Sequence, residues 1–103
     1  MAVVTWITDL QGQDLNERFQ PLFEALDLQL QELGSTALQL YAEDRRDAPI
    51  PVEARVKVLV SWLSQHRRDC QVEVRSSEAQ LRSNTRCQVI ADQLRSQLPP
   101  RAA

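Results

Sequence analysis

One alternating segment in the second half of the chain constrains the fold more than any other part. In Cys70–Arg75 (CQVEVR), polar side chains alternate with cysteine and valine. Because successive residues of a β-strand point to opposite faces, this pattern predicts a strand with one buried face. Strands in a sheet that is covered by helices on both faces are apolar on both sides, and this one is not. We therefore expect a sheet with helices mainly on one face.

The first part of the chain predicts a strand followed by a helix. Residues 2–7 are mostly β-branched or aromatic, as is typical of a strand. Residues 14–33 have apolar side chains spaced by three and four, which indicates a helix that ends at Gly34. Pro21 either kinks this helix or starts its regular part. Residues 36–42 fit a strand or a helix, and we favour a strand because the first strand needs a partner.

Residues 51–68 have the pattern of a second helix, with a proline and an acid near the start and basic residues at the end. On a helical wheel, Val58 and Trp62 lie on a flank about 100° from the main apolar stripe, beside Arg55. The apolar surface of this helix is therefore wider than one core requires. Tryptophan and arginine are frequent anchors of protein interfaces.

The last part predicts a third helix, because Ser77 and Gln80 have the spacing of a capping box. The resulting order is β-α-β-α-β-α, which predicts a two-layer α/β fold with helices mainly on one face of a small three-stranded sheet. The alternative is an all-α bundle. The length of 103 residues predicts a single globular domain over residues 1–98. Residues 99–103 are expected to form a flexible C-terminal tail.

The residues that usually carry chemistry are few. His66 is the single histidine, and the two cysteines have no ligand-type spacing, so we expect no metal, no cofactor and no catalytic site. Two glycines are few for a phosphate-binding loop. Cys70 follows two arginines that would favour a reactive thiolate, whereas Cys87 lies on the apolar stripe of the last helix. A small enzyme built from other residues stays an alternative, since sites are recognised by geometry.

Charge is divided unevenly along the chain. Residues 1–54 carry three basic and ten acidic residues, whereas residues 55–103 carry nine basic and four acidic ones. This asymmetry suggests an alternative function in nucleic-acid binding. The arginines that would serve it are Arg67, Arg68, Arg75, Arg82 and Arg86. The net charge of −2 and the pI near 5.3 disfavour nucleic acid, and the two halves are expected to neutralise each other.

The function that the sequence favours is a non-enzymatic protein–protein interaction or regulatory module. It would bind a partner protein, or a second copy as a homodimer, through Arg55, Val58 and Trp62. The first residues are apolar but lack a basic n-region, and Asp9 interrupts them, so we expect neither a signal peptide nor a membrane span. A cytoplasmic location is the resulting expectation.

Overall fold

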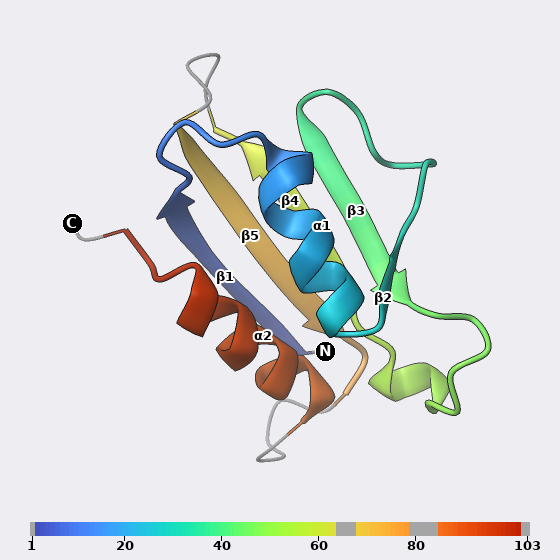
Figure 1. Ribbon diagram of the computed structural model, residues 1–103. Coiled ribbons are helices and arrows are strands. Elements are labelled where there is room, and N and C mark those ends of the chain that lie inside the picture. Colours follow the sequence, from blue (N-terminus) through green and yellow to red (C-terminus); the bar gives the residue numbers. More distant parts are fainter. Residues whose placement is uncertain (1, 64–67, 79–84, 102–103) are drawn as a thin grey trace.

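The computed structural model describes residues 2–63, 68–78 and 85–101 of the chain. Its elements are β1 (Ala2–Asp9), α1 (Leu15–Ala25), β2 (Leu28–Leu30), β3 (Gln39–Asp44), the 3-10 turn η1 (Val52–Ala54), β4 (Lys57–Trp62), β5 (Asp69–Ser76) and α2 (Arg86–Gln97). The strands form one sheet in the order β1-β5-β4-β3-β2, and every neighbouring pair is antiparallel. Both helices lie on the same face of this sheet, with α2 over β1 and β5 and α1 nearer β2 and β3 (Figure 1).

The structure contradicts the expected β-α-β-α-β-α order and the three-stranded sheet, and it contradicts the all-α alternative as well. The main reason is the segment that was expected to form the second helix. Only Val52–Ala54 form a helical turn, and residues 57–62 form β4 in the middle of the sheet. Val56, Val58 and Val60 are completely buried, while Lys57 between them is exposed. This alternation is that of a strand.

The first helix is also shorter than expected. Asp14 caps α1 by accepting a hydrogen bond from the Asn16 amide, and Pro21 lies inside the helix. The helix ends at Ala25 with Leu26 as its C-cap, because Asp27 takes a positive φ of 58° that a right-handed helix does not accommodate. Residues 28–30 then pair with β3 as the short strand β2.

The last helix begins at Thr85, whose side chain accepts a hydrogen bond from the Gln88 amide. The carboxylate of Glu78 accepts two further bonds from the amides of Arg86 and Cys87, 3.3 and 3.2 Å away. These acceptors satisfy N–H groups that have no partner within a helix. Ser77, which was expected to cap this helix, lies in a bend after β5, and Gln80 falls outside the described residues.

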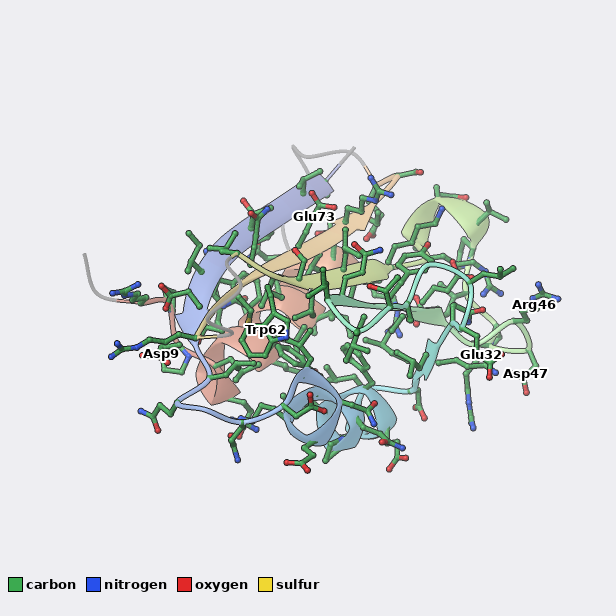
Figure 2. All side chains as sticks on the ribbon, turned by 90° about the horizontal axis from the view of Figure 1, so that it is seen from above. Asp9, Glu32, Arg46, Asp47, Trp62 and Glu73 are labelled. Atoms are coloured by element: carbon green, nitrogen blue, oxygen red, sulfur yellow. The ribbon has the colours of Figure 1, made fainter. Side chains whose placement is uncertain are left out.

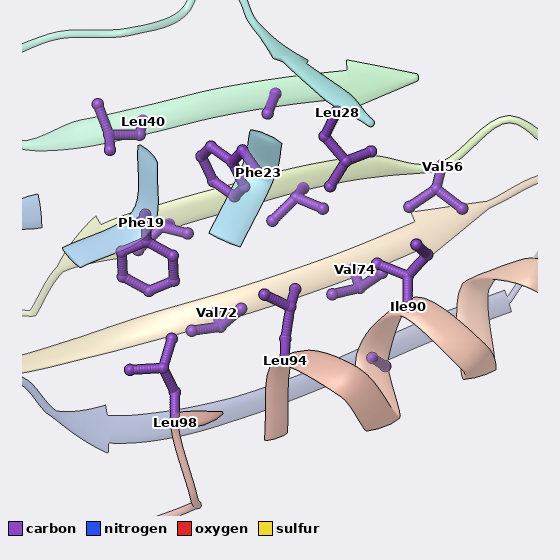
Figure 3. Packing of buried hydrophobic residues seen from close by; sticks show 14 of the residues in the cluster. Phe19, Phe23, Leu28, Leu40, Val56, Val72, Val74, Ile90, Leu94 and Leu98 are labelled. Carbon is purple, nitrogen blue, oxygen red and sulfur yellow. The ribbon is translucent and has the colours of Figure 1, made fainter. Parts of the chain in front are cut away.

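The core lies between the helices and the covered face of the sheet (Figure 3). Phe19 and Phe23 of α1 and Leu94 of α2 point into it, and the centroids of the two phenylalanine rings are 5.7 Å apart. The alternation expected in residues 70–75 is present in β5, where Cys70, Val72 and Val74 are fully buried. The opposite face of the sheet carries no helix among the described residues.

A buried ion pair joins the sheet to α2. Asp44, whose side chain is 1% exposed, ends β3, and Arg86 is the first residue of α2. The guanidinium of Arg86 donates from Nε to one carboxylate oxygen at 3.0 Å and from Nη2 to the other at 2.5 Å. The amide of Val56 donates to the same carboxylate at 2.8 Å. The carboxylate thus connects β3, the start of β4 and α2.

We expect Arg86→Met to lower the free energy of unfolding by about 3 kcal/mol, because it leaves a buried carboxylate without its counter-charge. Urea denaturation measures the change. Arg68→Met is the matched control, since Arg68 is 73% exposed and lies 3.6 Å from Asp9. This control should change the stability by less than about 0.5 kcal/mol. Equal effects of the two substitutions would contradict the structural role of the ion pair.

Candidate functional site

A cavity of about 590 Å³ opens where β3 and β5 end and β4 begins. The loop of residues 45–55 forms one wall and the end of β5 forms the other. Its lining residues are Glu43, Asp44, Arg46, Val52, Arg55, Val56, Lys57, Arg75, Ser76 and Ser77. Arg46 lies at the outer end of the molecule, on the tip of the loop (Figure 2). The cavity is within the size range of protein sites for small groups.

Two basic residues stand side by side in this cavity because of the strand register. Lys57 of β4 is directly opposite Arg75 of β5, and Glu43 of β3 is opposite Lys57 on its other side. Like charges in directly opposite positions destabilise a sheet. Glu43 accepts a hydrogen bond from the Tyr41 hydroxyl at 3.0 Å. Glu73 lies 4.0 Å from Arg75, at the edge of ion-pair distance, and Lys57 forms no ion pair with the residues that the structure describes.

Arg55 holds the loop wall of the cavity in place. Its guanidinium donates to the carbonyl oxygens of Arg45, Arg46 and Ala48 at 2.8, 3.0 and 3.1 Å. Backbone carbonyls are neutral acceptors, so these bonds fix the guanidinium without cancelling its positive charge. The sequence pattern had placed Arg55 on a helix, whereas in the structure it follows the turn η1.

The acidic residues of the cavity do not balance its basic ones. Four basic side chains line it, together with two acidic ones. Asp44 is already paired with Arg86 and bonded to the Val56 amide, which leaves Glu43 as the other carboxylate. The cavity is therefore an electropositive site in a protein whose net charge is −2. Such a concentration of one sign attracts ligands of the opposite sign.

The helix flank that was expected to bind a partner does not exist, because residues 57–62 form a strand. Val58 is completely buried under the helices. Trp62 also points to the covered face, between the sheet and the helices (Figure 2), and is partly buried against the core. Its Nε1 has no hydrogen-bond partner within residues 2–63, 68–78 and 85–101. Of this group, Arg55 alone lines the cavity.

The basic residues considered for nucleic acid are not gathered on one surface. Arg75 lines the cavity, whereas Arg68 precedes the other end of β5, seven residues or about 23 Å away along the strand. Arg86 is engaged in the ion pair with Asp44. Arg67 and Arg82 lie outside the described residues. The three arginines that can be placed thus have three different environments.

Both thiols are buried. Burial, together with the nearby carboxylates of Asp69 and Asp9, raises the pKa of Cys70 to about 12. Burial likewise raises the pKa of Cys87, whose sulfur lies 3.3 Å from the carbonyl oxygen of Val74. Both groups are therefore neutral thiols at pH 7, which does not suit a nucleophile. His66 lies outside the described residues.

Neither a metal site nor a membrane-spanning helix is found in the described residues. No group of three His, Cys, Asp or Glu side chains within those residues is placed to hold a metal ion. The helices seen in the same ranges are all too short or too polar to cross a membrane. No family model, curated protein or solved structure matches the chain.

Sequence reasoning missed most of the cavity. Lys57 and Ser76 were not among the candidate residues, because strand pairing is what brings them to the cavity. One local signal was present. In Val56–Val60 the only charged side chain, Lys57, stands between two valines, and a strand would place it opposite to them.

We expect Cys70 and Cys87 of the native protein to resist alkylation by iodoacetamide at pH 7.5. A pKa near 12 in place of 9.0 lowers the thiolate fraction of Cys70 at this pH about a thousandfold. A mass-spectrometric time course measures the reaction, and the protein in 6 M guanidinium is the control in which both thiols react. Modification of native Cys70 at the rate of free cysteine would contradict this environment.

Proposed function

We propose that this protein is a non-enzymatic interaction module that binds an acidic segment of a partner protein in the cavity at the end of the sheet. The observation that carries the proposal is the pair Lys57 and Arg75, which face the cavity side by side with little acidic compensation. A carboxylate between them would relieve their mutual repulsion and gain two charge-assisted hydrogen bonds.

The apolar part of the cavity supports a peptide as the ligand. Val52 is 81% exposed on the turn η1, and Val56 forms part of the wall behind it. An exposed valine beside basic groups suits a segment in which an acidic residue is next to an apolar one. Interfaces of this kind combine an apolar contact with a few well-placed polar groups.

A nucleic acid fits this surface less well. Binding to a phosphate backbone uses several basic residues spread along a continuous surface. The three candidate arginines that the structure describes, Arg68, Arg75 and Arg86, are instead divided between the two ends of β5 and a buried ion pair. The molecule as a whole is acidic, which opposes binding to a polyanion through long-range repulsion.

A fluorescein-labelled peptide of alternating aspartate and leucine provides the test. We expect saturable binding by fluorescence polarisation at low salt, with weakening at high salt because the contact is electrostatic. Lys57→Glu and Arg75→Glu should each weaken binding by at least about tenfold, a cost near that of one lost charged hydrogen bond. Val52→Ser should weaken it less.

Arg68→Glu is the matched control, since it makes the same charge change at the other end of β5. It should leave the affinity within about twofold of the original protein. An equal loss in this control would show that the peptide responds to overall charge and would contradict the site. Tighter binding of single-stranded DNA than of the peptide, lost in the same two variants, would favour nucleic acid instead.

A further inference from the structure

The first part of β1 forms an outer edge of the sheet that lacks the usual protection. It pairs with β5 on one side, and no described strand pairs with its other side. From Ala2 to Thr8 it contains no charged residue and no proline, and Val3 and Ile7 are each 42% exposed. Natural proteins usually protect an edge of this length with charges, prolines, bulges or a covering element. An unprotected edge is a template for a further strand.

The hydrogen-bonding groups of this edge can be assigned residue by residue. The amide of Leu10 donates to the carbonyl of Arg68 and continues the register with β5, so the even-numbered residues of β1 bond to β5. The odd-numbered residues therefore direct their N–H and C=O groups outward. The carbonyl of Ile7 agrees, since it accepts a 2.7 Å bond from the Arg101 amide on the outer side.

That bond shows that the edge already accepts one extended segment. Residues 99–101, which were expected to form a flexible tail, lie along the end of β1, where Pro99 accepts a hydrogen bond from the Thr8 hydroxyl. A groove of about 410 Å³ runs beside Thr5 and Ile7 next to this segment. The outward groups of Val3 and Thr5 have no bonding partner within the part of the chain that the structure describes.

The helix above this edge carries a second unsatisfied group. The guanidinium of Arg95 lies over the ring of Trp6, 5.2 Å from its centroid, on the β1 side of α2. Its Nε is buried and has no hydrogen-bond partner among the described residues. Asp92, one turn before Arg95, is exposed and accepts a 2.9 Å bond from Gln88. One flank of α2 thus presents two groups that can form further hydrogen bonds. Arg95 has a donor without an acceptor, and the carboxylate of Asp92 can accept from a further donor.

We propose that two copies of this chain form a homodimer by antiparallel pairing of their β1 strands. Val3 of each copy would lie opposite Thr5 of the other, with the two-fold axis at Val4. Each of these two pairs exchanges two backbone hydrogen bonds. The pairing stops before Ile7, whose outward carbonyl is already engaged by Arg101. The two sheets would become one continuous sheet.

The same axis brings the two α2 helices together with complementary charges. The sulfur of Cys87 lies 3.6 Å from the carbonyl oxygen of Ala2, and the carbonyl of Leu98 accepts a bond from the Trp6 indole. The helix therefore runs in the direction of β1, and the two copies of α2 are antiparallel in the dimer. The flanks that carry Asp92 and Arg95 then face each other across the axis.

A second copy fits this edge better than an unrelated strand for two reasons. The uncharged strand is complementary to itself, because no like charges meet at any position of the pairing. The flank of α2 supplies both the acceptor and the donor that an isologous interface needs, since each occurs once in each copy. Val4, which is partly exposed on the covered face at this edge, would be covered by Val4 of the second copy.

Sedimentation equilibrium of the full chain tests the proposal. We expect a dimer, and we expect Thr5→Pro to shift it to monomer because the substitution removes an outward N–H. The variant should still fold, since this N–H does not bond to β5 and proline is tolerated at such edge positions. Asp92→Lys makes both of the facing α2 flanks basic and should weaken the dimer by at least about tenfold. Adding Arg95→Glu to Asp92→Lys should restore most of the affinity.

Glu24→Lys on the exposed side of α1 makes the same charge change as Asp92→Lys and should leave the dimer unchanged. Amide hydrogen exchange of Val3 and Thr5 should slow as the dimer forms. A protein that is monomeric up to about 1 mM would overturn the proposal. So would a dimer that withstands both Thr5→Pro and Asp92→Lys. Lys57→Glu, which tests the cavity, should leave the dimer intact, so the two proposals fail separately.

Discussion

The carboxylate of Asp44 is the group on which much of this structure depends. An ionised carboxylate with 1% exposure is stable only if donors surround it, and here the donors come from Arg86 and the Val56 amide. This requirement fixes the start of α2 against the end of β3 and the start of β4. It also removes the negative charge of Asp44 from the adjacent cavity. The same ion pair therefore holds the fold together and makes the neighbouring site electropositive.

The one-sided arrangement of the sheet determines where contacts with other molecules can form. Two helices cover one face, so the other face presents side chains from every long strand (Figure 2). On that face Lys57 and Arg75 are neighbours because of the strand register. At the outer edge of the sheet, the exposed side chains of Val3 and Ile7 lie beside backbone groups that point outward. The two surfaces differ in chemistry, because one offers charge and the other offers backbone hydrogen bonds. The binding of an acidic partner segment is proposed for the first surface, and pairing with a second copy of the chain is proposed for the second.

The uneven distribution of charge along the sequence suggested nucleic-acid binding, but the structure gives it a different explanation. The basic second half does not form one basic surface, because Arg86 turns inward to Asp44 and Arg68 lies near Asp9. Both of these acidic partners, Asp44 and Asp9, belong to the first half of the chain. The two halves do neutralise each other in these pairs. The local excess at Lys57 and Arg75 arises where that neutralisation is incomplete.

The sequence by itself determined the strands in residues 2–7 and 70–75 and a helix that ends before Pro99. An element with one buried face has a regular spacing of apolar residues, and a short segment of sequence is enough to recognise that spacing. It did not determine residues 51–62, since Val56, Val60 and Leu63 also match the spacing of a helix. Pairing with β3 and β5 decided that segment as a strand, and such pairing is a long-range effect. The cavity depends on the same pairing. Only the tertiary structure could place Lys57 beside Arg75, because residues far apart in sequence become neighbours through strand register.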